Sequence, residues 1–450
     1  MQDVLQIIEE RKEIYMQWLI DLCRQPSVAA QNLGMAETAA LVEKMLQEVG
    51  AQTRQVPTSG FPVVYGEMGE GERTLLFYNH YDVQPPEPLD EWHSPPFAAE
   101  VRDGTIYARG VGDNKGNLVA RLGAVDAYVR ARGTLPLRIK FIFEGEEEIG
   151  SPHIGEFAEA HPDLVAADAC VWEAGYSDPD GRREMSLGVK GILYVEIEAR
   201  EANTDLHSMW ATVVPNAAWR LLRALESLKD ANNRVMIPGF YDPVRPLTQA
   251  DEQALLEMPF NENARREQWG IPAFNNNLSG VPLLTQHIFM PTCNICGITS
   301  GYTGPGMKTV LPHRATAKLD FRLVPDQDPH VIFEHLTEHL RQQGYGDIEV
   351  RMLSAEHPAR TPIEHPFALL CREITRELSG KEPVVYPIIP ATGPMHALCA
   401  RYGIPTVSLG VGNVNSRVHA PNENILLEDY YMGIAQIATI IDRFPATASQ

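Results

Sequence analysis

Histidine and carboxylate side chains in this sequence gather directly after short apolar runs. His80 and Asp82 follow the run 74–79, and the acidic segment 144–148 (EGEEE) follows the run 137–143. Four carboxylates in five residues repel one another unless water or cations surround them. Taken alone, each segment also fits a solvated loop. Their place after apolar strands favours a function, because ligand clefts in α/β sheets lie at the carboxyl ends of the strands.

Further candidates lie in polar turns, and they are Asp113 (in RGVGDNKG), Glu173 (after ACVW) and His419 (in RVHAPNE). Asp113 alone could be a helix N-cap. Its glycine-rich turn lacks the Ser or Thr of a phosphate-binding loop, so a phosphate site is not favoured. Considered together, the candidates fall near the predicted ends of successive strands. We therefore expect one site that contains His80, Asp113, Glu147 or Glu148, Glu173 and His419.

This mixture of imidazole and carboxylate ligands suits zinc, manganese or cobalt better than calcium. One histidine and one carboxylate for each metal, with a further carboxylate bridging them, would make a two-metal site. Two ions about 3.5–4 Å apart polarise a carbonyl and convert bound water to hydroxide. A spare carboxylate can then act as general base and acid. The residues therefore predict a metal-dependent hydrolase.

The elements that would position these residues belong to an α/β domain. The apolar runs 74–79 and 137–143 are bounded by turn-forming residues and predict buried strands. The segments 35–50 and 116–132 carry apolar residues at helical spacing and predict helices. A strand, a helix and a second strand in succession indicate a sheet with parallel members.

The middle of the chain has a different pattern. From 186 to 200 the apolar residues alternate with period two, which predicts an antiparallel strand with one solvated face. Similar strands are expected at 315–323 and 347–353, with helices at 216–229 and 329–343. After 363 we expect a helix (366–378), apolar strands (384–389 and 405–409) and a closing helix. These patterns predict a discontinuous catalytic domain, 1–187 and 361–450, with an α+β domain inserted at 188–360.

The composition excludes several classes of function. The chain has 450 residues and a formal net charge of −21, which disfavours nucleic acid and anionic membranes as partners. No apolar run is long enough to span a bilayer. The N-terminal segment resembles an amphipathic helix rather than a signal peptide. Six scattered cysteines make a disulfide framework unexpected and favour a reducing, cytoplasmic location.

Four motifs, NHYDVQP, RGVGDNKG, EGEEEIGS and VHAPNE, closely resemble the family of two-zinc peptidases and deacylases. The family includes carnosinase, acetylornithine deacetylase, succinyl-diaminopimelate desuccinylase and glutamate carboxypeptidase. The resemblance covers essentially the whole chain, and the segment 294–329 looks most like the carnosinase-type dipeptidase branch. It implies a zinc-peptidase-like catalytic domain with a mixed, mostly parallel central sheet flanked by helices. It also implies that the inserted domain is a lid and dimerisation domain with an antiparallel sheet.

The resemblance implies a role for each candidate. One metal would be held by His80, Asp113 and Glu173, and the other by Asp113 (bridging), Glu148 and His419. Asp82 would support His80. Glu147 would be the catalytic base that takes a proton from the metal-bridging water and passes it to the leaving amine. A metal-bound carboxylate stays ionised while the proton affinity of its neighbour is set separately, so adjacent glutamates can take different tasks.

The inserted domain supplies further candidates by resemblance. His207, in the segment 205–208 (DLHS), would enter the active site of a partner subunit and stabilise the oxyanion of the tetrahedral intermediate. Arg322 would bind the carboxylate of the substrate, although a surface ion pair is the alternative. Cys293 and Cys296 have CxxC spacing without a second pair, so we interpret them as packed strand cysteines.

One departure from the family concerns the substrate. Relatives in the dipeptidase branch have a GGS or GGT turn where this chain has 391–396 (ATGPMH). That turn, with Gly393 here, helps to hold the terminal carboxylate, so strict dipeptide specificity is in doubt and His396 could be a new contact.

We therefore predict a homodimeric two-metal hydrolase, with zinc, manganese or cobalt, that cleaves a dipeptide or an N-acyl amino acid. One alternative is a deacylase or amidohydrolase of non-peptide amides or carbamates. A remote alternative is an inactive metal-binding scaffold. It is disfavoured because suitable residues occupy every expected ligand position and the position of the base.

Overall fold

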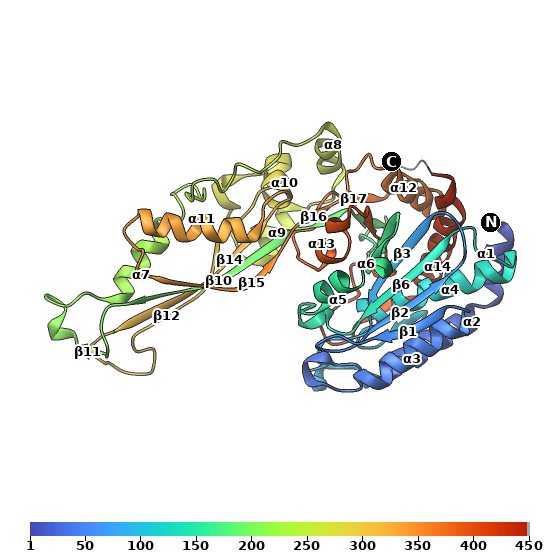
Figure 1. Cartoon of the computed structure of the whole chain (residues 1–450), viewed down its shortest axis with the longest axis horizontal. Coiled ribbons are helices and arrows are strands. Elements are labelled where there is room, and N and C mark those ends of the chain that lie inside the picture. The colour runs from blue at the N-terminus through green and yellow to red at the C-terminus, as the bar shows by residue number, and fades with distance from the viewer. Residues whose placement is uncertain (448–450) are drawn as a thin grey trace. The chain divides into compact units, whose positions relative to one another are not determined.

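The first and last parts of the chain form one unit, and the middle of the chain forms a second (Figure 1). The computed structural model describes residues 1–447. Unit 1 consists of Met1–Gly188, Arg360–Pro387 and Gly393–Gln450. Unit 2 consists of Val189–Ala359 and Ile388–Thr392, and the sequence patterns did not predict this second, short segment. The chain enters and leaves the long segment of unit 2 at β9 (Gly188–Val189) and β16 (Ala359–Arg360).

Unit 1 is built on an eight-stranded sheet. Its strands, in spatial order, are β1 (Gln52–Val56), β2 (Val63–Met68), β6 (Arg138–Glu144), β3 (Thr74–His80), β7 (Ala169–Trp172), β18 (Thr406–Ser408), β8 (Glu184–Ser186) and β17 (Val384–Tyr386). The central strands β6, β3, β7 and β18 are all parallel to their neighbours in this group. β3 is buried along almost its whole length, as expected of a parallel strand covered on both faces. The carboxyl ends of these four strands therefore meet at one edge.

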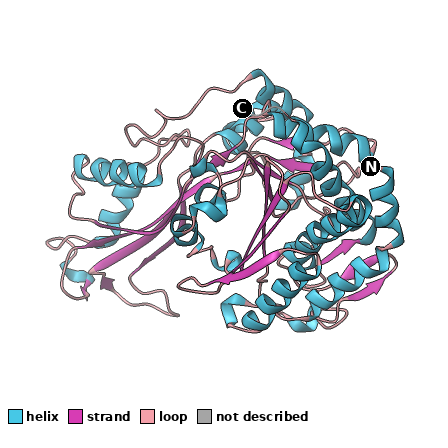
Figure 2. Cartoon of the chain, turned by 45° about the vertical axis from the view of Figure 1, so that its right-hand side comes forward, coloured by secondary structure: helices cyan, strands magenta, loops and turns pink. Residues whose placement is uncertain are grey.

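Helices cover both faces of this sheet (Figure 2). They are α1 (Gln2–Glu10), α2 (Lys12–Arg24), α3 (Met35–Glu48), α4 (Gly116–Arg132), α5 (Ile154–Ala160), α6 (Pro162–Val165), α12 (Pro366–Ser379), α13 (Met395–Leu398) and α14 (Leu427–Arg443). α4 is buried along most of its length and packs against α14 and α1. A Cβ at Gly123 of α4 would lie 3.1 Å from the Ile434 side chain, so a small residue permits this close approach. A separate sheet contains β19 (Asn424–Leu426), β5 (Thr105–Tyr107) and β4 (Glu100–Arg102).

Unit 2 contains a four-stranded antiparallel sheet. Its order is β12 (Asn294–Ser300), β14 (Arg314–Leu323), β10 (Gly191–Arg200) and β15 (Glu349–Glu356). β10 alternates between buried and half-buried residues, and its buried side packs under α7 (Ala217–Glu226) and α11 (Pro329–Gln342). The remaining elements are α8 (Gln249–Glu257), α9 (Glu262–Trp269), α10 (Gly280–Phe289) and the pair β11 (Leu206–His207) and β13 (Val310–Leu311).

The predicted fold class is confirmed: the chain has a mixed, mostly parallel sheet flanked by helices and a separate antiparallel sheet. Within residues 1–447, no helix has the length and apolar character needed to cross a bilayer. All six cysteines are free. The prediction of two packed strand cysteines is wrong for Cys296, which lies on β12 but is exposed, because β12 is an edge strand with few neighbours.

Candidate metal centre and active site

The carboxyl ends of the parallel strands bring the predicted ligands of unit 1 together. His80 is the last residue of β3, Glu173 follows β7, and Glu147 and Glu148 lie just beyond β6. Asp113 lies in the turn that precedes α4, and its peptide bond to Asn114 is cis. His419 lies in the long loop after β18 and has a positive φ of 62°.

Asp113 lies between the two histidines. Its Oδ1 is 3.0 Å from His80 Nε2, and its Oδ2 is 3.2 Å from His419 Nε2. His419 Nε2 is also 3.1 Å from Glu148 Oε2. One carboxylate thus presents a different oxygen to each imidazole, which is the arrangement that a carboxylate bridging two cations requires.

The other carboxylates lie close to the same atoms. His80 Nε2 is 3.8 Å from Glu173 Oε2 and 3.9 Å from Glu147 Oε2. Single ligand atoms of His80, Asp113 and Glu148 all lie within 4.8 Å of one another. That triplet takes members from both predicted ligand sets, which is consistent with two sets that share Asp113.

Asp82 fixes two parts of the site at once. The Nδ1 of His80 lies 3.1 Å from the backbone carbonyl oxygen of Asp82 and 3.3 Å from its Oδ1, so Asp82 holds that ring with Nε2 directed at Asp113. The two carboxylate oxygens of Asp82 also accept hydrogen bonds from the backbone N–H groups of Glu147 (3.2 Å) and Glu148 (3.0 Å). The side chain of Gln84 donates to Glu148 Oε2 at 2.9 Å. The turn that carries the two glutamates is therefore attached to the strand that carries the histidine.

The electrostatics of the site indicate missing positive charge. Four carboxylates, those of Asp113, Glu147, Glu148 and Glu173, surround two imidazoles. Burial and the charge of Glu147 raise the pKa of Glu173 well above its usual range. Burial also raises the pKa of Glu147, to about 7, against the opposing effect of His80. Hydrogen bonds to Asp113 and Glu148 raise the pKa of His419 to about 10. A buried group of carboxylates of this kind favours the binding of cations.

These residues fit a pair of divalent cations. The Oε2 atom of Glu173 is buried and has no hydrogen-bond partner, which is costly unless a cation binds there. Imidazole nitrogens with carboxylate oxygens are donors that zinc, manganese and cobalt accept. His80 is fully buried, so its Nε2 is held in a fixed direction.

Sequence reasoning missed the residue that positions the Asp113 turn. Glu423 is 1% exposed and pairs with Arg109, with Nη1 and Oε2 2.7 Å apart. Its carboxylate also accepts from the backbone N–H groups of Gly110 (2.9 Å), Gly112 (2.8 Å) and Asp113 (3.1 Å). Arg109 begins the motif RGVGDNKG and Glu423 ends the motif VHAPNE. Their role shows only in the structure, where the two side chains are buried and paired with each other.

The substrate candidate of unit 2 has a defined contact. The Arg322 guanidinium donates to Thr392 Oγ1 at 2.8 Å and to Asp320 Oδ2 at 3.3 Å. Thr392 belongs to the segment 391–396 (ATGPMH), where the sequence leads us to expect a departure from the dipeptidase branch. The structure thus brings Arg322 to that turn, while the role of Gly393 stays a prediction.

His207 is exposed and held in one tautomer. Its Nδ1 accepts a hydrogen bond from the backbone N–H of Met209 at 3.1 Å, so Nδ1 carries no proton. Nε2 therefore carries the proton of the neutral ring and lies 3.2 Å from Thr309 Oγ1. The ring presents an N–H donor, which is the group that stabilisation of an oxyanion needs.

Comparison with known proteins identifies the family of this chain. Residues 76–443 match the model of peptidase family M20/M25/M40. The Beta-Ala-His dipeptidase of Homo sapiens is 28% identical over 430 residues, covering 92% of this chain and 83% of that protein. The Cys-Gly metallodipeptidase of Candida albicans is 27% identical over 370 residues, covering 76% of each chain.

Solved structures lead to the same family. An M20 family metallo-carboxypeptidase from Sulfolobus solfataricus is similar with a TM-score of 0.88 and 38% identity, covering 96% of this chain and 99% of that one. Human carnosine dipeptidase 1 is similar with a TM-score of 0.76 and 25% identity, covering 99% and 98%. This chain therefore belongs to peptidase family M20/M25/M40 and is a metal-dependent hydrolase.

Proposed function

We propose that the chain is a two-metal peptidase that hydrolyses the amide bond of a dipeptide or an N-acyl amino acid. The observation that carries this proposal is the position of Asp113, whose two oxygens face His80 and His419 separately. His80 and Glu173 would complete the ligands of one cation, and Glu148 and His419 those of the other. Zinc is the expected metal, with manganese or cobalt as alternatives.

Bound divalent cations would polarise the scissile carbonyl and lower the pKa of a water molecule. Glu147 would accept the proton of that water and later deliver it to the leaving amine. Burial raises the pKa of Glu147, and this direction favours both tasks, because a group that takes and gives protons works best when its pKa lies near the operating pH. Asp82 would hold His80 and the Glu147 backbone in fixed positions during the reaction.

The residues of unit 2 would act on the substrate. Arg322 would hold a carboxylate, since a guanidinium can bind both oxygens at once. His207 would donate a hydrogen bond from its Nε2–H group to the developing oxyanion. In this proposal, as in the family resemblance, His207 comes from a partner subunit.

Unit 2 carries a surface suited to a homodimer. β12 is an edge strand, and six of its seven residues are exposed. Ile295 and Ile298 on this strand are 47% and 50% exposed, and Trp219 on α7 is 63% exposed. An unpaired apolar edge is a template for another chain, so proteins rarely leave one uncovered.

Two activities remain to be separated. The names of the relatives describe dipeptidases and a carboxypeptidase, whereas the altered turn around Thr392 keeps the alternative of a deacylase of non-peptide amides or carbamates. Both use the same ligands and the same base, so the choice depends on what binds near Arg322.

A reconstitution assay tests the proposal. Dialysis against a chelator should abolish hydrolysis, and zinc, cobalt or manganese should restore it. The substrates would be dipeptides, longer peptides, N-acyl amino acids and carbamates, each with a carboxyl-terminal amide as control. We expect dipeptides or N-acyl amino acids with a free carboxylate to be cleaved fastest. Full activity of the metal-free protein would reject the mechanism, and equal rates for the amide controls would reject the role of Arg322.

A further inference from the structure

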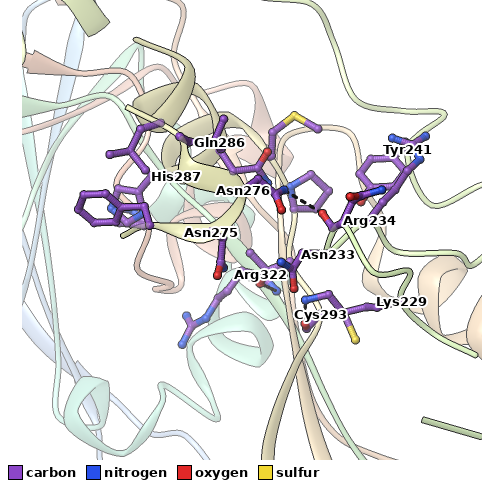
Figure 3. A pocket seen from close by; sticks show the side chains of 18 of the residues that line it. Lys229, Asn233, Arg234, Tyr241, Asn275, Asn276, Gln286, His287, Cys293 and Arg322 are labelled. Carbon is purple, nitrogen blue, oxygen red and sulfur yellow. Dashed lines mark hydrogen bonds between the residues drawn. The ribbon is translucent and has the colours of Figure 1, made fainter. Parts of the chain in front are cut away.

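A cavity of about 470 Å³ lies entirely within unit 2 (Figure 3). This volume is typical of sites for small molecules. Four cationic side chains line the cavity, and no aspartate or glutamate does; the four are Lys190, Lys229, Arg234 and Arg322. Of these, Arg322 is paired with Asp320 at 3.3 Å. The whole chain has a formal net charge of −21, so this local excess of positive charge is opposite to the average of the protein.

Lys190 is a buried cation without a carboxylate partner among residues 1–447. Its side chain is 2% exposed, and its ammonium donates to the carbonyl oxygens of His287 (2.8 Å) and Met290 (2.7 Å). An ammonium has three N–H donors, so one remains for a ligand. Burial, together with the charge of Arg322, lowers the pKa of Lys190 to about 8, which leaves it charged at neutral pH.

Lys229 and Arg234 are likewise unpaired with any carboxylate in the described part of the chain. Lys229 Nζ donates to the Cys293 carbonyl at 3.2 Å, and the Arg234 guanidinium lies 4.3 Å from the centre of the Tyr241 ring. Asp230 is the nearby acid in sequence. Its Oδ1 accepts hydrogen bonds from the backbone N–H groups of Asn232 and Arg234, each at 2.8 Å, so this carboxylate stabilises the turn at 230–234.

The remaining walls suit a molecule with a carbon skeleton. Amide side chains, including Asn275 and Gln286, can donate to or accept from a ligand. Leu283 and Met290 contribute apolar surface. Figure 3 shows Lys229 and Arg234 on the opposite side of the cavity from Gln286. A molecule that spans the cavity would meet positive charge and amide groups at separate points.

We propose that this cavity is a binding site for a small organic anion with two carboxylates. The cations would pair with the carboxylates, and the apolar wall would contact the carbon chain between them. The site shares Arg322 with the proposed hydrolytic function and rests on it at that residue, whereas Lys190, Lys229 and Arg234 have no role in hydrolysis. Binding needs no turnover, so failure of this proposal can be distinguished from failure of the proposed hydrolysis. Its ligand could be a free dicarboxylate or the acidic part of a peptide substrate, which share the same chemistry.

Calorimetric titration of the metal-loaded protein with glutarate tests the proposal. Glutaramide, the neutral analogue, and butyrate, which has one carboxylate, are the matched ligands. We expect glutarate to bind, butyrate to bind more weakly and glutaramide not to bind. The double variant Lys229→Gln, Arg234→Gln should weaken glutarate binding roughly tenfold or more, because each lost charge-assisted contact costs a measurable fraction of the affinity. Gln286→Glu should weaken it through repulsion without changing the size of the side chain.

Arg351→Gln is the control, since Arg351 is also in unit 2, is 52% exposed and pairs with Glu196 away from the cavity. No glutarate binding to the parent protein, or unchanged affinity in the double variant, would overturn the proposal. Kinetic assays then identify the source of the anion. A rise in KM for acidic dipeptides caused by glutarate indicates a substrate carboxylate, whereas binding without any change in KM indicates a free ligand.

Discussion

At the scale of single residues, neighbouring carboxylates have different surroundings and would do different work. Glu148 contacts His419 and Gln84, whereas Glu147 lies 3.9 Å from His80. The carboxylate of Glu146 pairs with His153 at 2.8 Å. In the proposed mechanism, three consecutive glutamates would thus provide a ligand, a base and a structural contact. The sequence alone could name the first two only by resemblance.

Replacement of Glu147 tests this division of labour. Glu147→Gln removes the proton acceptor but keeps the shape of the side chain, so kcat should fall by about 10²–10⁴-fold with metal content unchanged. Glu146→Gln is the matched control and should retain most of the activity. The measurements are initial rates on a cleaved dipeptide and metal analysis by mass spectrometry. Near-normal turnover of Glu147→Gln would mean that another group is the base.

At the scale of elements, strand order determines where the ligands lie. β3, β6, β7 and β18 are parallel neighbours, so the residues after them share one edge of the sheet. The apolar runs at 74–79 and 137–143 predicted two of these strands. A parallel strand that is buried on both faces consists almost entirely of apolar residues, so it is easily recognised in the sequence. Other elements of unit 2 were harder to predict from the sequence. The exposure of β12 was not foreseen, and no helix was predicted between residues 249 and 289.

The hydrogen bonds of Glu423 also lay beyond sequence reasoning, because they join residues more than 300 positions apart. Glu423→Gln should disturb the turn that positions Asp113, since an amide cannot accept with both of its terminal atoms. Loss of such a supporting contact lowers metal affinity by about 10–100-fold in metal sites generally. Competition with a chromogenic chelator would measure the change. An unaltered affinity would show that the turn holds its shape without this carboxylate.

The end of β15 provides a prediction on pH. Burial raises the pKa of Glu356 from 4.5 to about 7, and no cation pairs with it among residues 1–447. The folded state therefore holds this proton more tightly than the unfolded state, and the free energy of unfolding falls as pH rises from about 4.5 to 7. Glu356→Gln avoids this loss. Its melting temperature relative to the parent should be about 1–2 °C higher at pH 8 than at pH 5. A difference that does not change with pH would contradict the half-buried, unpaired environment of Glu356.

At the scale of the whole molecule, the proposed dimer links the exposed edge of unit 2 to catalysis. The paired substitution Ile295→Glu, Ile298→Glu should convert the dimer to a monomer, because it places charge on both apolar positions of β12. Leu353→Glu is the control, since Leu353 is 51% exposed on β15 at the opposite edge of the same sheet. Light scattering after size-exclusion chromatography gives the mass.

The monomer should also lose most of its activity while keeping its metals, because His207 would then have no partner site to enter. A fully active monomer would show that His207 is not used across subunits. A parent protein that is already monomeric would remove the proposed interface.

Metal stoichiometry tests the central claim most directly. Native mass spectrometry of the zinc-loaded parent should show two ions per chain, and His80→Ala and His419→Ala should each reduce the number to one. Asp113→Asn should weaken both ions together, because its two oxygens serve the two positions. A single ion in the parent, or two ions retained after either histidine is removed, would contradict the two-metal centre.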